Sequence, residues 1–492
     1  MLNVSATVAG RPGGSVRRTT LPVHCAAALW LALSGTAGTA LADGSAVPVA
    51  TATPAVPRMA ADPGSAGQAL LQTIAGAVDP ARLRATIARL VGFGTRSTIS
   101  ETGSSTHGIG AARRWAQAEF AAISSQCGQC LEIVTPSQVF TGERLPKPTE
   151  VMDVVAIQRG TDDAQRVILI TGHIDSRNSN DQDADGIAPG ANDDGSGTAA
   201  VLEAARVLSR YRFHATLVYG VLSGEEQGLY GGKVLAEYAK AQGWKVEADL
   251  NNDIIGNSQG QNGVVDNSTV RVFSEGTRSL ETPQQAARRR YNGGEVDSPS
   301  RNLARFMADM ADRHVPNLNV RMIYRTDRFG RGGDQVEFLA QGFPAVRVTE
   351  AHENYTRQHQ DVRGEGGIAY GDVLEGVDFT YLAQVTRLNL VTLAALASAP
   401  APPSAVGIAG AVQSDTTLNW TGVAGAVAYR VWWRDTTAPR WQFSRLFPSA
   451  ATPENTAILR NVVIDDWFFG VSAISADGFE SPVVFPGPPG AF

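Results

Sequence analysis

The chain has 492 residues, of which 43% are hydrophobic and 18% are charged. This composition excludes a collagen-like, a coiled-coil and a wholly disordered protein, and the length predicts two to four domains. The 42 Lys and Arg are outnumbered by 48 Asp and Glu, which gives a net charge of -6. Because no long basic run is present to neutralise phosphates, we expect no nucleic-acid partner.

Residues 1–42 have the pattern of a secretory signal peptide. Arginines precede an uncharged stretch, 21–42, which ends in Ala40-Leu41-Ala42, the A-x-A pattern of a cleavage site. An uncleaved membrane anchor is the competing interpretation, but small residues in the second half of the stretch weaken a span. We therefore expect a secreted or periplasmic protein without stable membrane insertion after cleavage.

The next segment, 43–67, is rich in Ala, Pro, Val, Thr and Gly and predicts a flexible linker. Outside the signal peptide the only cysteines are Cys127 and Cys130, in a C-x-x-C pattern. In an exported protein this pattern favours a small-loop disulfide. A redox site lacks the βαβ pattern expected nearby, and a zinc knuckle would need a second ligand pair, for which no residues are placed.

Between residues 68 and 398, short apolar runs alternate with segments of helical periodicity. The expected helices are 68–77, 80–91, 106–122, 198–208, 232–241, 300–313, 334–341 and 374–397. The expected strands are 167–170, 216–222, 249–255, 270–273 and 345–348. This alternation predicts an α/β domain with a mixed, mostly parallel sheet flanked by helices.

The composition and hydrophobic pattern of the chain change at Ala399, where a proline-rich run begins. The segment 399–492 contains short strand-like pieces separated by turns, which predicts an all-β sandwich. The patterns Leu418-x-Trp420 and Phe469-x-Val471-x-Ala473 resemble a fibronectin type III module. Such modules mediate attachment or spacing, so we expect contact with a surface or polymer there and no catalysis.

The first two candidate functional segments are His173-x-Asp175 and a glycine-rich loop that contains Asp193. An imidazole just past a buried parallel strand lies where α/β sheets place ligands, and Asp175 is placed to accept the other ring N–H. Alone, His-x-Asp is more often structural, and Asp193 also fits an ordinary helix start. A phosphate loop is disfavoured because Lys is absent and two adjacent carboxylates would repel phosphate, so a cation site suits the loop better.

The remaining candidates follow the later strands. Glu225 and Glu226 follow shortly after strand 216–222, and their side chains can point in different directions, one toward a metal and one toward its water. A solvated acidic turn is the simpler alternative. Asp253 adds a further acid, and a histidine-containing loop after strand 345–348 supplies a second imidazole. Chance helix caps and surface acids would not be expected to fall in this order at successive strand ends.

The order His, Asp, Glu-Glu, Asp, His resembles the two-zinc exopeptidase family (peptidase clan MH) that includes aminopeptidase Y, bacterial leucyl aminopeptidases and glutamate carboxypeptidase. The likeness covers roughly 80–397. It implies two Zn²⁺ per chain, with Asp175 orienting a ligand, Glu225 as general base, and five metal ligands: His173, Asp193 as the bridge, Glu226, Asp253 and His359. The Tyr-x-x-x-His-x-Asp context of His359 favours it over His352 as the last ligand.

The resemblance implies a secreted metallo-aminopeptidase that removes N-terminal residues from peptides, with a metal-bridging hydroxide attacking the carbonyl and Glu225 taking its proton. Ligands without Cys also favour an open, catalytic zinc, for which cobalt or manganese can substitute. A metallocarboxypeptidase or a glutaminyl cyclase on the same fold is an alternative. A non-catalytic adhesion or binding protein is another, against which the intact Glu-Glu pair argues.

Overall fold

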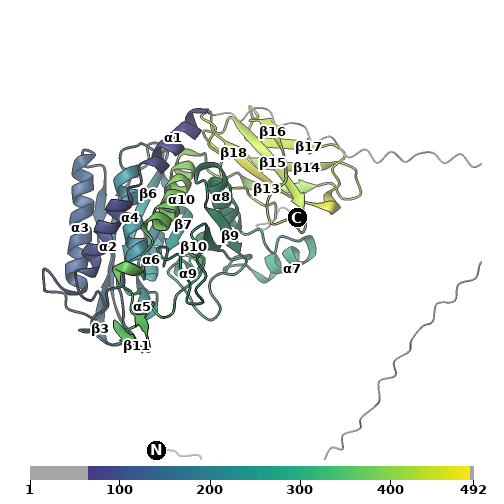
Figure 1. The fold of residues 1–492 in the computed structure, drawn as a ribbon. Helices are drawn as coiled ribbons and strands as arrows, with labels where there is room; N and C mark the ends of the chain where they lie inside the picture. The colour runs from purple at the N-terminus through teal and green to yellow at the C-terminus, as the bar shows by residue number, and fades with distance from the viewer. Residues whose placement is uncertain (1–64, 488–492) are drawn as a thin grey trace, which may run out of the picture. The chain divides into compact units, whose positions relative to one another are not determined.

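The computed structural model describes residues 65–487, so the predicted signal peptide and most of the predicted linker lie outside the described residues. Eight strands form the central sheet of Figure 1: β1 (Glu132–Val134), β4 (Val154–Gln158), β5 (Asp163–His173), β6 (Ala215–Leu222), β7 (Lys245–Asn252), β8 (Thr269–Phe273), β9 (Asn319–Ile323) and β10 (Ala345–Glu350). Their order is β1-β4-β6-β5-β7-β10-β8-β9.

This sheet is mixed and mostly parallel, as predicted. Strands β6, β5, β7 and β10 run parallel to one another, and β8 is parallel to β9. Antiparallel pairs join β1 to β4, β4 to β6 and β10 to β8. The parallel centre therefore brings the carboxyl ends of β5, β6, β7 and β10 to one edge, where the candidate residues lie.

The helices divide between the two faces of the sheet (Figure 1). One apolar core involves α1 (Ser65–Gly76), α2 (Pro80–Val91), α3 (Gly108–Gln126), α4 (Gly195–Leu208), α8 (Pro299–His314) and α10 (Phe379–Ser398). The second core involves α6 (Tyr230–Ala241) and α9 (Gln335–Ala340). Along β5, Ile168 and Ile170 enter the first core and Val167 and Leu169 the second, so this strand is buried on both faces.

The structure also corrects two predicted boundaries next to the site. Strand β7 stops at Asn252 rather than at residue 255, because Ile254 adopts a φ of 54°, outside the extended region. Helix α10 begins at Phe379 rather than at 374, since Asp378 caps it by accepting from the N–H groups of Thr380 and Tyr381. Residues Leu374–Gly376 instead form a 3-10 turn, η1.

Several elements were not predicted; apart from the buried five-residue strand β4, they are short or bury little apolar surface. Helix α7 (Pro283–Asn292) has no buried residue and is capped by a Thr282–Gln285 capping box. The others are short, edge or surface elements: the four-residue helix α5 (Glu225–Gly228), the hairpin of β2 (Ser137–Gly142) and β3 (Leu145–Met152), the hairpin of β11 (Arg363–Glu365) and β12 (Ile368–Tyr370), and the sheet strands β1, β4 and β9.

The C-terminal segment forms two three-stranded antiparallel sheets. They contain β13 (Ser404–Ala409), β14 (Thr416–Thr421) and β17 (Glu454–Leu459) in one sheet, and β16 (Phe443–Pro448), β15 (Ala428–Asp435) and β18 (Trp467–Ile474) in the other; η2 (Ile464–Asp466) precedes β18. Both sheets contribute to one apolar core that includes Leu418, Trp420, Tyr429 and Val471. The likeness to a type III module remains a prediction.

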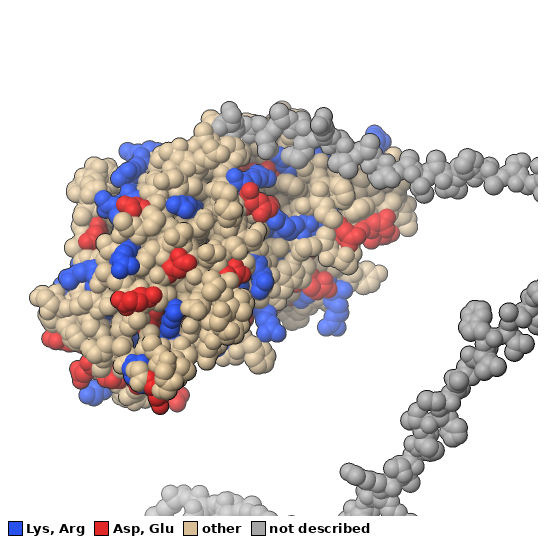
Figure 2. All heavy atoms as spheres, viewed as in Figure 1, with Lys and Arg blue, Asp and Glu red and all other residues tan. Residues whose placement is uncertain are grey.

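Cys127 and Cys130 are joined in a disulfide at the end of α3, as predicted. None of the helices within 65–487 combines the length and hydrophobicity needed to cross a bilayer. On the face shown in Figure 2, acidic and basic side chains are interspersed rather than gathered by sign.

Candidate metal centre

His173 is the last residue of β5, and its side chain is buried. Its Nδ1 lies 3.1 Å from the backbone carbonyl oxygen of Asp175 and 3.5 Å from the carboxylate of the same residue. The Asp175 carboxylate also accepts from the backbone N–H groups of Glu225 and Glu226, at 3.4 and 3.2 Å. Asp175 therefore ties the end of β5 to the start of α5, and Nε2 of His173 is left facing the site.

Asp193 lies in the loop between β5 and α4. Its carboxylate approaches both candidate histidines: Oδ1 is 3.3 Å from Nε2 of His173, and Oδ2 is 3.0 Å from Nε2 of His359. Gln358 also donates to Oδ2, at 3.0 Å. The two oxygens thus face opposite sides of the site, which is the geometry required of a bridging carboxylate.

The sequence also allowed this loop to provide an ordinary helix start, and the neighbouring Asp194 does so as the N-cap of α4. Its carboxylate accepts from the backbone N–H groups of His173, Gly197 and Ile254, at 3.0, 2.8 and 3.2 Å. A Cβ on Gly197 would collide with the backbone oxygen of Asn252 and with the Asp194 carboxylate. The loop glycine therefore lets the start of α4 pack against the end of β7.

Glu225 and Glu226 open α5 directly after β6, and Gly224 makes the turn with a φ of 75°. The Glu226 Oε2 lies 3.0 Å from Nε2 of His359. The Glu225 carboxylate instead groups with His173 and Asp253, with one candidate ligand atom from each of these three residues within 4.8 Å of the others. The two carboxylates point in different directions, as the sequence pattern predicted.

Asp253 follows the end of β7 and is buried. Its Oδ1 lies 3.9 Å from Nε2 of His173, and its Oδ2 accepts from Nη1 of the fully buried Arg347 on β10. Burial opposes a charged Asp253, but Arg347 and His173 outweigh it and hold the pKa of this carboxyl below its usual range. Arg347 thus keeps Asp253 ionised.

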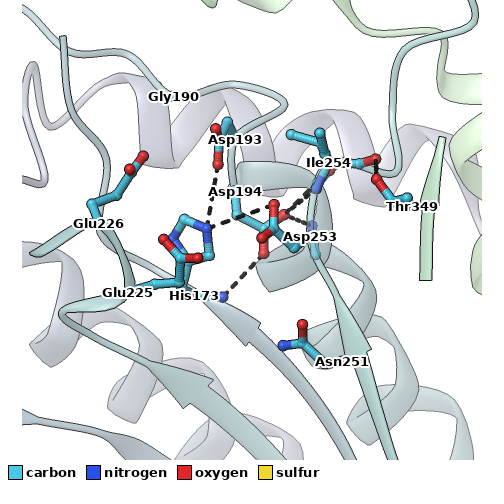
Figure 3. Close-up of polar contacts among 12 residues, drawn as sticks. His173, Gly190, Asp193, Asp194, Glu225, Glu226, Asn251, Asp253, Ile254 and Thr349 are labelled. Atoms are coloured by element: carbon cyan, nitrogen blue, oxygen red, sulfur yellow. Dashed lines mark hydrogen bonds and ion pairs between the residues drawn. The ribbon is translucent and has the colours of Figure 1, made fainter. Parts of the chain in front are cut away.

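The five predicted ligands and Glu225 converge at one edge of the sheet. His173 lies beside one oxygen of Asp193 and near Asp253, and His359 lies beside the other oxygen and near Glu226. Figure 3 shows Asp193, Asp253 and Glu225 around the His173 ring. His359, with a φ of 55°, reaches Asp193, whereas the alternative ligand His352 belongs to neither group of candidate ligands within the described residues.

These residues fit metal ions. Nε2 of His173 and Oε1 of Glu226 are buried and have no hydrogen-bond partner among residues 65–487. Leaving such groups unpaired costs about 1–3 kcal/mol each, so an ion that binds them relieves that cost. Imidazole and carboxylate ligands suit zinc, and a set without Cys is typical of catalytic zinc.

The electrostatics of these residues also favour a bound cation. Although Glu225 keeps part of its surface open to the cavity, desolvation, assisted by the charges of Asp253, Glu226 and Asp193, raises its pKa to about 8. Burial lowers the pKa of His359, but the carboxylates of Glu226 and Asp193 outweigh burial and raise it to about 10. The folded chain therefore holds protons where metal ions would bind, since both provide positive charge.

Two further residues that the motifs did not identify hold the Asp193 loop from either side. The carboxylate of Asp372 accepts from the backbone N–H groups of Asn192 and Asp193, the second at 2.7 Å. The buried guanidinium of Arg96 donates to three backbone carbonyls of the same loop, all before Asp193: those of Ile174, Pro189 and Gly190. Both residues lie within the range of the family resemblance, 80–397, but the resemblance assigned a role to neither of them.

Asp194→Ala is expected to lower the free energy of unfolding by about 3 kcal/mol, because three buried N–H groups lose their acceptor. Asp79→Ala is the matched control: Asp79 caps α2 through one exposed hydrogen bond, to Ala81, and its loss costs about 1 kcal/mol. Urea unfolding of the zinc-loaded proteins measures both values. Equal losses would contradict the role assigned to Asp194.

Known proteins are similar to this chain over most of its length. Residues 153–363 match Peptidase family M28. A "probable zinc metalloprotease" of Leptosphaeria maculans is 43% identical over 422 residues, which cover 85% of this chain and 97% of that protein. Another, of Pyrenophora teres f. teres, is 41% identical over 424 residues, covering 85% and 87% respectively.

A solved structure with a similar fold is the LapA aminopeptidase of Legionella pneumophila. It is 20% identical to this chain, with a TM-score of 0.49, and the similarity covers 67% of this chain and 75% of LapA. The fungal proteins are similar over most of both chains, and the family match spans residues 153–363, which include all five predicted ligands. The chain therefore belongs to peptidase family M28 and is a zinc metallopeptidase.

Proposed function

We propose that this protein is a two-zinc aminopeptidase that hydrolyses the N-terminal residue from peptides. One observation carries the proposal: the carboxylate of Asp193 lies between a pair formed by His173 and Asp253 and a pair formed by His359 and Glu226. Two ions that share a carboxylate lie close enough to act on one peptide bond.

The proposed chemistry assigns Glu225 the proton transfers. Bound zinc supplies polarisation of the peptide carbonyl and a lowered pKa of water. Glu225 borders the same cavity as the ligands and lies beside His173 and Asp253. Its carboxylate takes a proton from the attacking water and passes it to the leaving amine, the part of a general base and then of a general acid.

The size and charge of the cavity support action at a chain end. The cavity has a volume of about 430 Å³, near the lower limit of ligand pockets, so it suits a short piece of peptide. The acidic residues of its lining are Asp193, Glu225, Glu226 and Asp253. Zinc ions held by these carboxylates would bind a free α-amino group in its neutral form, which would place the cleaved bond at a chain end.

The aminopeptidase assignment predicts a sharp dependence on the free amine. A panel of aminoacyl anilides and their N-acetyl counterparts measures it, and blocking the amine is expected to lower kcat/KM about a hundredfold or more, because a site built to bind a polar group rejects analogues that lack it. Cleavage of N-blocked peptides from their free C-terminus would instead identify a carboxypeptidase. Conversion of N-terminal glutamine without hydrolysis would identify a cyclase.

A further inference from the structure

Beyond the predicted ligands, the cavity is lined by an excess of basic side chains. Its acidic lining consists of the four carboxylates already placed at the metals or the reacting water. All its other charged lining residues except His359 are arginines: Arg144, Arg177, Arg328 and Arg331. Once two divalent ions balance the acids, the field toward a substrate is set by these guanidinium groups.

Two of these four arginines, Arg328 and Arg331, lie on one wall, formed by the loop between β9 and α9 and the strands beside it. Three guanidiniums converge on the carboxylate of Glu353: those of Arg271, Arg328 and Arg331, at 2.9, 3.6 and 2.7 Å. The side chain of Glu353 is only 3% exposed. One carboxylate therefore faces three positive charges with little solvent to screen them.

The remaining acids of this wall do not restore the balance. Arg328 also contacts Asp327, at 3.0 Å, and Arg347 lies 3.9 Å from the same carboxylate. The main partner of Arg347 is Asp253, a metal ligand. If the charge of Asp253 balances a metal ion, only the carboxylates of Asp327 and Glu353 remain to balance the four guanidiniums of this wall, those of Arg271, Arg328, Arg331 and Arg347. The wall then keeps a net positive charge.

Two nitrogens of this wall have no hydrogen-bond partner among the described residues, Nε of Arg347 and Nη1 of Arg328. The side chain of Arg328 is 8% exposed, and its buried Nη1 lies 3.6 Å from the carboxylate of Glu353. Its Nη2 donates to the backbone carbonyl of Gly332, at 2.6 Å, so the guanidinium is held in place. Arg331 is bound through Nη1 to Glu353 and is 33% exposed, so the rest of its guanidinium remains accessible from the cavity.

We propose that Arg331, with the charge of Arg328 behind it, binds a carboxylate of the substrate next to the scissile bond, so that the enzyme prefers substrates that carry a carboxylate there. This inference rests on the proposed aminopeptidase function. The carboxylate has two possible sources: the side chain of an N-terminal Asp or Glu, or the free C-terminus of a dipeptide. Both present the same planar group, which matches the fork of a guanidinium.

Isosteric substrate pairs test the preference in the zinc-loaded full chain. A glutamyl anilide is compared with the glutaminyl anilide, and the dipeptide Leu-Ala with its C-terminal amide. We expect kcat/KM for the charged member of one pair to exceed that of its neutral isostere about tenfold or more. The pair that responds identifies the source of the carboxylate, and absence of preference in both pairs would overturn the proposal.

Variants then locate the binding group. Arg331→Gln and Arg328→Gln are each expected to lower the responding ratio about tenfold, and Arg331→Lys to restore part of it. Arg325→Gln is the matched control, because Arg325 lies in the same loop, packs over Phe329 and does not line this cavity. If Arg331→Gln kept the full ratio, or Arg325→Gln lost it equally, these arginines would not be the binding group.

A binding measurement separates this proposal from the proposed function. On zinc-loaded Glu225→Gln protein, free glutamate or the Leu-Ala dipeptide is expected to raise Tm more than glutamine or Leu-Ala amide, respectively. Arg331→Gln in the same background should remove that difference. If no aminoacyl substrate were hydrolysed but the binding preference held, the proposed function alone would fail; hydrolysis without any acidic preference would overturn this inference alone.

Discussion

Glu225→Gln is expected to lower kcat by about 10²- to 10⁴-fold while the zinc content stays the same. General base catalysis by a positioned side chain contributes about this factor, and the variant removes the base while keeping its size. The nearest candidate ligand atoms belong to His173 and Asp253, whose positions depend on β5 and β7 rather than on Glu225. The measurement combines steady-state kinetics with metal analysis of the same preparation.

Glu226→Gln is the matched control for Glu225→Gln. The two residues are adjacent in α5, but the Glu226 carboxylate lies 3.0 Å from His359 and is the proposed ligand. Its loss should lower the zinc:protein ratio together with the activity. If Glu225→Gln or Glu225→Ala retained full peptidase activity with unchanged zinc, the proposed base would be wrong.

The sequence predicted those parts of the site that follow from strand ends. His173, Glu225 and Glu226 were found because an apolar run ends directly before them, and parallel strands bring such ends to one edge of the sheet. The same reasoning placed the central strands, since continuous apolar runs predict strands buried on both faces. These features are local in the chain.

The supporting residues depend on contacts between distant segments and were not predictable in this way. Arg347 is the one polar residue of the predicted strand 345–348, and its partner Asp253 is 94 positions away. Asp372 reaches Asp193 across 179 positions. No periodicity marks such pairs, because they are defined only once β7, β10 and the loops after them have packed.

The choice between His352 and His359 shows the same limit. Both lie in the loop after β10, and the motif context alone favoured His359. The structure brings His359 to Asp193 and Glu226 through a left-handed backbone conformation at this residue. A φ of 55° at a histidine has no signal in the surrounding composition, since it is imposed by the loop contacts.

Removal of the metal is expected to abolish peptidase activity and to destabilise the chain, and zinc should restore both. Ligands that bind only the folded state stabilise it by about 4 kcal/mol at a thousand times Kd. Without ions, the carboxylates of Asp193, Glu226 and Asp253 repel one another in a largely buried site. Chelation, followed by activity assay and thermal unfolding, measures the effect; the control is chelator already saturated with zinc.

The stabilisation by zinc should also grow as pH rises from 6 to 8. In the metal-free folded chain the pKa of Glu225 is raised to about 8, chiefly by burial, and that of His359 to about 10, because nearby carboxylates outweigh burial. The folded state therefore binds more protons than the unfolded state in this range, and metal-free stability falls as pH increases. Zinc displaces these protons, so the Tm gap between zinc-loaded and metal-free protein widens.

Histidine variants show whether this Tm difference between zinc-loaded and metal-free protein arises at the proposed metal centre. His359→Gln is expected to lower the zinc:protein ratio from about two toward one, because three or four protein ligands are needed to hold each zinc. His352→Gln is the matched control, since His352 lies in the same loop but outside both ligand groups. It should keep both ions and the pH-dependent Tm gap. A loss of zinc in His352→Gln with retention in His359→Gln would reverse the assignment of the last ligand.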